Sequence, residues 1–151
     1  MKELEDVLKT KVKLSLSKKT VLNITYSSIC MRDIMTSVLK PFDISIEQFN
    51  VLRILRGQKG NPANLQDIQD RMISKMSNTT RLVDKLILKG FVERFTCANN
   101  RRKVEIFITN SGLEVLKDID PIVEKTEIDV TSKLSINELE TLNYLISKLR
   151  D

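Results

Sequence analysis

The chain has 151 residues, 41% of them hydrophobic and 30% charged, which is enough for one globular domain with its own core. It has no histidine and only two, widely separated cysteines, which argues against hydrolytic triads, zinc sites and a disulfide framework. The net charge of +5 is uneven, because residues 53–103 hold 12 lysines and arginines against 4 acidic residues, whereas residues 104–151 hold 5 against 10. The basic middle third indicates either contact with a polyanion or lysines that only solvate helix faces.

The first part of the chain has the pattern of two helices. Apolar residues recur every three or four positions from about residue 2 to Leu39, where Pro41 stops the helix, and a break is expected near residues 15–19. A second helix begins after Ser45 and ends at Gly57. Its expected buried stripe is Phe49, Leu52 and Leu55.

Two further helices follow a loop at residues 58–63. Asn64 is expected to cap a short helix, with Asp67 completing a capping box. Ser74 is expected to cap a longer helix that runs to Gly90. The inward side chains of this longer helix are expected to be Thr79, Leu82, Val83, Leu86 and Ile87.

A β-hairpin comes next. Residues 92–97 and 104–109 are rich in β-branched and aromatic side chains, and the polar residues 98–103 are expected to form the loop between them. This loop ends in three consecutive basic residues, so the hairpin has a strongly basic tip.

Two helices are expected to close the chain. The first opens near residue 110 and runs to about Lys133, bent at Pro121, whose missing N–H weakens one turn. Ser135 caps the second, with Glu138 at the capping-box position. Because the first helix of the chain also has an apolar stripe without an obvious partner, we expect both ends of the chain to form a homodimer interface. The expected interface residues of the last helix are Leu139, Leu142, Ile146 and Leu149.

This order of helix, short helix, capped helix and hairpin is that of a winged helix-turn-helix. We expect a single, mainly helical domain with a small β-hairpin wing, in which about residues 45–110 form the DNA-binding lobe and about residues 1–42 and 111–151 the dimerisation helices. A helix presented by its N-terminal turn fits the major groove, and an arginine-tipped hairpin can enter the minor groove. Plain capping and solvation would equally explain residues 74–78. The side chains expected to contact DNA are Ser74, Lys75, Ser77, Asn78, Thr80, Arg81 and Lys85 on this reading helix, and Arg101, Arg102 and Lys103 on the wing.

Several segments resemble the MarR (multiple antibiotic resistance regulator) family. Residues 80–86 and 89–94 are similar to its reading-helix signature, residues 101–109 with Gly112 to its wing, and residues 44–49 to the start of its second helix. The resemblance implies an obligate dimer with interlocked terminal helices that binds a palindromic operator in double-stranded DNA, as a repressor. It also implies a small-molecule effector, phenolic or anionic, that releases DNA from a pocket between the dimer helices and the winged lobe.

Three positions deserve comparison with the family pattern. Arg102 matches the wing arginine that the family places in the minor groove, but the acidic residue that often braces it is Asn100 here. Met76 occupies a position that is commonly polar, so we expect an altered base preference. Asn78 stands where a small hydroxyl residue is common, and asparagine is a good partner for adenine.

The two cysteines raise the question of peroxide sensing, which one branch of the family performs. The sensor cysteine of that branch would align near Val21 rather than at Cys30. Neither Cys30 nor Cys97 has an evident histidine or arginine partner to activate it, so we expect buried structural thiols.

Other classes of function have less support. The chain has no glycine-rich phosphate loop and no nucleophile motif, so we expect no catalysis, no cofactor and no metal. A winged helix that binds protein instead of DNA is the alternative, although the basic middle third argues against it. No apolar run is long enough to cross a bilayer and residues 1–19 do not form a secretory signal, so we expect a cytoplasmic protein without a membrane partner.

Overall fold

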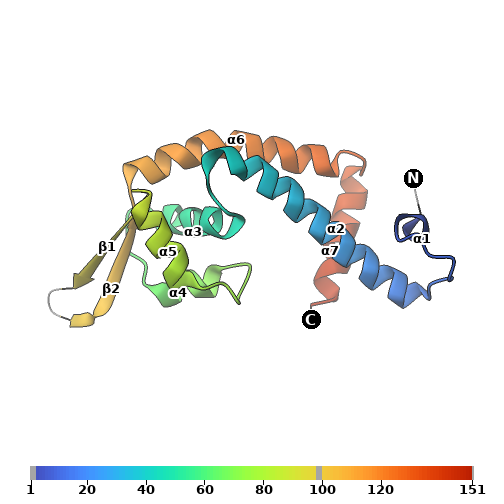
Figure 1. The fold of residues 1–151 in the computed structure, drawn as a ribbon, viewed down its shortest axis with the longest axis horizontal. Helices are drawn as coiled ribbons and strands as arrows, with labels where there is room; N and C mark the ends of the chain where they lie inside the picture. The colour runs from blue at the N-terminus through green and yellow to red at the C-terminus, as the bar shows by residue number, and fades with distance from the viewer. Residues whose placement is uncertain (1–2, 98–99, 151) are drawn as a thin grey trace.

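The computed structural model describes residues 3–97 and 100–150, with the backbone alone for Cys97 and residues 100–103. A lobe of short helices and a hairpin lies at one end, and two long helices, α2 and α6, contact each other and diverge as they extend away from the lobe (Figure 1). The expected mainly helical fold with a small β-hairpin wing is confirmed. The elements are α1 (Leu4–Val7), α2 (Leu16–Leu39), η1 (Lys40–Phe42), α3 (Ile46–Gly57), α4 (Leu65–Arg71), α5 (Thr79–Leu88), β1 (Val92–Cys97), β2 (Asn100–Ile108), α6 (Asn110–Thr131) and α7 (Ile136–Lys148).

Helix α3 lies at the centre of the lobe. Its start is fixed by a capping box, in which the Gln48 N–H donates to Ser45 Oγ (3.2 Å) and the Ser45 N–H donates to Gln48 Oε1 (3.0 Å). The predicted stripe of α3 is buried, since Phe49, Leu52 and Leu55 are 4%, 0% and 2% exposed. These side chains join one core with α2, α4, α5, the hairpin and α6, so the lobe and the near ends of the long helices are a single packed body.

The N-terminal segment differs from the expected long helix. Helix α1 ends where Lys9 takes a left-handed conformation, with φ 51°. Residues 8–15 separate it from α2, and Ser15 caps α2 by accepting the Lys18 N–H (3.4 Å). The break therefore lies at residues 8–15, earlier than the expected residues 15–19, because the Ser15 cap starts α2 at Leu16.

The wing is a two-stranded antiparallel sheet. Its strands keep one register up to Thr96, after which the register shifts so that Cys97 lies opposite Asn100. The expectation of a loop is wrong for residues 100–103, because the backbone from Asn100 onward belongs to β2, and residues 98–99 lie outside the described residues. Backbone pairing between strands tolerates polar and basic residues, which propensity alone assigns to a loop.

Hydrogen bonds join the residues that precede and follow the wing at its base. The Thr109 hydroxyl donates to the Gly90 carbonyl (2.7 Å) and accepts the Gly112 N–H (3.1 Å), which also caps α6. A Cβ at Gly112 would lie 2.3 Å from the Phe91 carbonyl oxygen, so only glycine allows this approach. The base of the wing is therefore rigidly attached to the end of α5.

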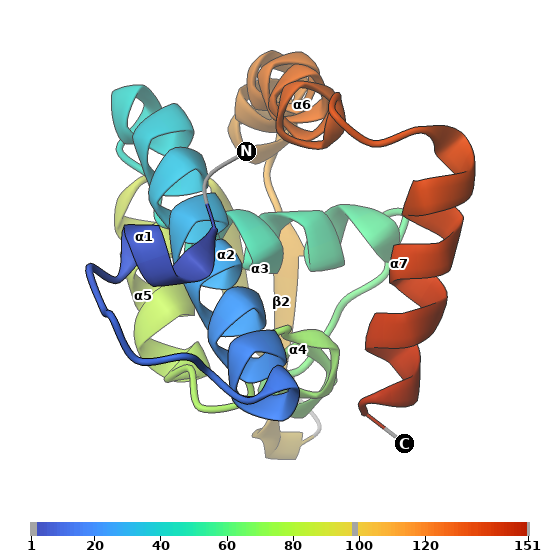
Figure 2. The same ribbon diagram turned by 90° about the vertical axis from the view of Figure 1, so that its right-hand side faces the viewer.

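The terminal helices carry apolar side chains that nothing in the described chain covers. Helix α7 begins with the predicted Ser135–Glu138 capping box, yet none of its residues is buried within the described part of the chain. In Figure 1 α7 overlaps α2, but Figure 2 shows that the two helices stand apart. Of the four predicted interface residues, Leu139 is half-buried, and the other three are exposed: Leu142 at 42%, Ile146 at 39% and Leu149 at 65%.

The described residues hold neither a membrane-spanning helix nor a cluster of metal-ligating side chains. Within residues 3–97 and 100–150, no helix is long and apolar enough to cross a membrane. The same residues contain no group of three or more histidine, cysteine, aspartate or glutamate side chains placed to hold a metal ion.

Candidate nucleic-acid interface

Helix α5, the reading helix of the sequence analysis, presents its N-terminal turn to solvent. Its cap is Asn78, whose Oδ1 accepts the Arg81 N–H (3.0 Å). The buried Thr79 hydroxyl donates to the Gln69 side chain and so joins α5 to α4. The core side of α5 is as predicted, with Thr79, Val83 and Leu86 buried and Leu82 and Ile87 half-buried. The opposite face is exposed and carries Thr80, Arg81 and Lys85.

The prediction that Ser74 caps this helix is wrong. Met72 ends α4 in an extended conformation and is 1% exposed, so the chain must turn before a new helix can begin. Residues 73–78 make that turn, in which the Ser77 N–H donates to the Ser74 carbonyl (3.2 Å). Ser74, Lys75 and Ser77 are therefore loop residues before α5 and not its first turn.

One open groove of about 460 Å³ brings together five of the seven residues predicted around the reading helix. Lys75 and Thr80 do not line it, although both are exposed nearby on the loop and on the first turn of α5. Among the residues that the structure describes, no acidic side chain forms an ion pair with Arg81 or Lys85. Their charges are thus available to an anion. The predicted residues that line this reading groove are Ser74, Ser77, Asn78, Arg81 and Lys85.

The groove also contains an ion pair that the sequence analysis missed. Arg32 of α2 donates to Glu47 of α3 at 2.7 Å, and both side chains line the groove. Partial burial opposes ionisation of Glu47, but hydrogen bonds from Arg32, its own backbone and Ser45, together with the Arg32 charge, hold the pKa of Glu47 below its ordinary value. No local sequence pattern links Arg32 with Glu47, because only the packing of α2 against α3 brings them together.

The wing is joined to α5 by an ion pair between Arg94 of β1 and Asp84 of α5, 2.7 Å apart. On the wing itself, Phe95 and Phe107 stack edge to face with ring centroids 5.9 Å apart. The backbone of the predicted wing residues Arg101, Arg102 and Lys103 lies in β2, but their side chains lie outside the described residues.

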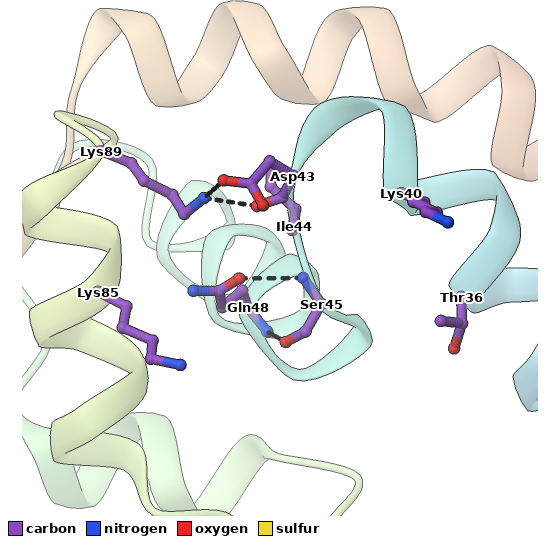
Figure 3. A pocket seen from close by; sticks show the side chains of 8 residues that line it. All are labelled: Thr36, Lys40, Asp43, Ile44, Ser45, Gln48, Lys85 and Lys89. Carbon is purple, nitrogen blue, oxygen red and sulfur yellow. Dashed lines mark hydrogen bonds and ion pairs between the residues drawn. The ribbon is translucent and has the colours of Figure 1, made fainter.

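A second open groove, of about 500 Å³, lies at the other end of α5, where α2, η1 and α3 meet it (Figure 3). Lys89 donates one hydrogen bond to the Asp43 carboxylate and another, of 2.6 Å, to the Asp43 carbonyl. The hydrogen bond to the carboxylate and the charge of Lys89 hold the pKa of Asp43 below its ordinary value. Lys40 and Lys85 also line this groove. Lys85 therefore lies between the two grooves and borders both.

The chain is similar to known proteins in sequence and in fold. The family model described as MarR family matches residues 44–104. The multiple antibiotic resistance protein MarR of Escherichia coli strain K12 is 29% identical over 118 residues, which cover 77% of this chain and 80% of that protein. The crystal structure of a MarR transcription factor from Planctomyces limnophilus is 30% identical, with a TM-score of 0.70, and covers 90% of this chain and 98% of its own.

Two more distant structures share the fold. A crystal structure of a mutant of Escherichia coli MarR complexed with operator DNA is 22% identical, with a TM-score of 0.76 over 99% of each chain. The structure of Bordetella bronchiseptica BpsR, whose DNA binding is regulated by 6-hydroxynicotinic acid, is 18% identical, with a TM-score of 0.79 over 93% of this chain and 99% of that one.

A helix-turn-helix with an exposed reading helix, followed by a wing, defines a winged-helix DNA-binding transcription regulator. The chain belongs to the MarR family of such regulators, whose members are not enzymes.

Proposed function

We propose that this chain is a repressor that binds a palindromic operator as a homodimer and that a small anionic ligand releases it. The observation that carries the proposal is the reading groove, which is lined by the unpaired cations Arg81, in the exposed N-terminal turn of α5, and Lys85, in its last turn. A helix N-terminus with free cations attracts phosphate and can approach base edges in the major groove. A regulator bound in this way covers its operator and so blocks transcription from it.

The proposed contacts fall into two kinds. Arg81, Asn78 and Ser77 are assigned to base edges, because they lie in the first turn of α5, at its cap and immediately before that cap, respectively. The Asn78 Oδ1 already caps the helix, so its side-chain NH₂ group is the part that remains to donate to a base. The contacts to phosphate are assigned to Ser74, Lys75, Thr80 and Lys85 and to the wing residues Arg101, Arg102 and Lys103.

The dimer is proposed from the exposed apolar side chains of α2 and α7. Leu16 is 83% exposed and Val21 62%, and the stripe of α7 is likewise uncovered. A second copy related by a two-fold axis would cover both helices, in an interface of roughly 2,000 Å² or more as in obligate dimers. Two reading helices related by that axis would read two inverted half-sites, which is why we propose a palindromic operator.

The wing supplies a test of DNA binding that does not depend on the operator sequence. Each phosphate contact contributes about 0.9 to the log–log salt slope of binding, so Arg102→Ala, present twice in a dimer, should flatten the slope by about 1.8. Affinity should fall while the fold and the dimer survive, because the wing tip is outside the core. Titrations of duplex DNA at three salt concentrations, with thermal melting of each variant, measure both effects.

The matched control is Lys117→Ala, which removes an exposed cation from α6 away from the reading groove and should leave the slope unchanged. An unchanged slope for Arg102→Ala would place the wing outside the DNA contact. If the wild-type protein itself shows no salt-dependent binding to any duplex, the chain is better described as a winged-helix scaffold for protein contacts.

The proposed effector site is the groove shown in Figure 3, between the end of α2 and the reading helix. Its volume of about 500 Å³ suits a small aromatic acid, and the cations Lys40, Lys85 and Lys89 line it. A bound carboxylate would compete with Asp43 for Lys89 and would draw Lys85 away from the DNA surface that it also borders. Binding of the ligand and binding of DNA would then oppose each other.

We expect benzoate and hydroxybenzoates to weaken DNA binding by the wild-type protein and to have little effect on Lys40→Met. Lys40 lines the effector groove but not the reading groove, so DNA affinity without the acid should be unchanged. Competition binding on one duplex, with chloride held constant, measures this. Equal loss of binding in both proteins would show that the acids act elsewhere, and no loss in either would argue against an aromatic-acid effector.

A further inference from the structure

Met76 lies in a turn whose residues on both sides are hydrogen-bonded to α4, and its side chain points into solvent. It is 95% exposed, whereas Met72 at the start of the same turn is 1% exposed and packs in the core. The Gln69 side chain donates to the Lys75 carbonyl on one side of Met76 and accepts the Thr79 hydroxyl on the other. Because one side chain holds both flanks, the position of Met76 is set by the fold.

Met76 also lies on the surface proposed to contact DNA. It lines the reading groove together with Asn78, Arg81 and Lys85. Exposure of the apolar Met76 side chain to water is unfavourable. A polyanion that covers the groove would remove this apolar surface from water, which would stabilise the complex. The surrounding positive charge selects DNA over an apolar protein surface as the covering partner.

The major groove offers one apolar group for such a side chain. The 5-methyl group of thymine is the only methyl on the edges of the four bases, and apolar side chains contact it there. Methionine suits this contact, since its unbranched thioether adapts to small changes in position.

We propose that Met76 packs against the 5-methyl group of a thymine in each operator half-site and so determines a preference for thymine there. This inference rests on the proposed DNA binding. Burying about one methyl group corresponds to roughly a fourfold gain in affinity per half-site, or about 15-fold for a dimer on two half-sites.

The test compares thymine with uracil, which lacks only the 5-methyl group and keeps the same hydrogen-bonding edge. A duplex is first selected from random-sequence DNA with the wild-type protein, and the same duplex is then synthesised with uracil in place of thymine. We expect the wild type to bind the thymine duplex about 15-fold more tightly. For Met76→Ala this ratio should fall toward one, while its thermal melting stays as in the wild type because the side chain is exposed.

The matched control is Leu88→Ala, at the far end of α5, the helix that follows the turn containing Met76. Leu88 is 87% exposed and does not line the reading groove, so its removal should leave the thymine-to-uracil ratio as in the wild type. Since both variants meet the same two duplexes, any effect of uracil on the shape of DNA is common to them.

The outcomes separate this inference from the proposed function. If the wild type selects no duplex from the random pool, DNA binding itself has failed. If it selects one but binds the uracil form equally well, or if Met76→Ala keeps the wild-type ratio, the assignment of Met76 is overturned. A change in the oligomeric state of Met76→Ala, measured by sedimentation, would assign this side chain to a protein contact instead.

Discussion

Replacing Leu142 and Ile146 together by aspartate should abolish dimerisation and leave a chain without a stable fold. Both side chains lie on the uncovered stripe of α7, at 42% and 39% exposure in a single chain. In the proposed dimer they would be buried, so the two substitutions place four carboxylates in an apolar interface. Each unpaired charge costs on the order of several kcal/mol there, and an obligate dimer that cannot assemble has no stable folded monomer.

Sedimentation at micromolar concentration and thermal melting measure this effect. The control replaces Asn137 and Thr141 by aspartate, which adds the same charges at the same spacing on the opposite face of α7. This control should remain a folded dimer. A well-folded monomer of the Leu142 and Ile146 variant would show that the terminal helices do not make the interface.

Arg81→Ala should remove most of the discrimination between a selected duplex and random DNA. A good side-chain contact to a base is worth about 1–3 kcal/mol, so losing one in each of two half-sites should cost roughly 2–6 kcal/mol on the selected duplex. Binding to random DNA should fall far less, because it depends mainly on phosphate contacts. Competition of the selected duplex against the random pool gives the ratio directly.

Arg53→Ala is the matched control for this change. Arg53 is an exposed arginine of α3 whose guanidinium lies over the Phe49 ring, away from the reading groove. Its removal should leave the selectivity intact. If Arg81→Ala retains the wild-type ratio, then α5 does not read bases through this residue. Asn78 is better tested as Asn78→Ser, since serine keeps a helix cap that alanine would lose at a cost of about 1 kcal/mol.

Local patterns of the sequence predicted much of the fold. The buried face of α5 followed from helical spacing, and the caps at Asn64 and Ser135 followed from capping boxes that need only four consecutive residues. The cap of α5 was misplaced because Ser74 and Asn78 are both good caps, and burial of Met72 decides between them. Burial depends on the whole core, which no short window of sequence contains.

The candidate site was predicted less completely than the fold. The reading groove contains five residues expected from the sequence, because they lie close together along the chain around one helix end. Its remaining ion pair joins Arg32 and Glu47 from separate helices, and the second groove depends on Lys89 meeting Asp43, 46 residues away. Such pairs follow from tertiary packing alone, so a single sequence does not reveal them.

The separation of α7 from the reading helix has a genetic consequence. The two lie in different parts of the molecule, so a change on the exposed face of the reading helix leaves α7 intact (Figure 1). In the proposed dimer, the product of an allele altered at Arg81 would still pair with wild-type subunits, and each mixed pair would hold an operator by one half-site. Such an allele should be dominant over the wild type. An allele that disrupts α7 should instead be recessive, because its product cannot enter a pair and leaves the wild-type subunits to assemble among themselves.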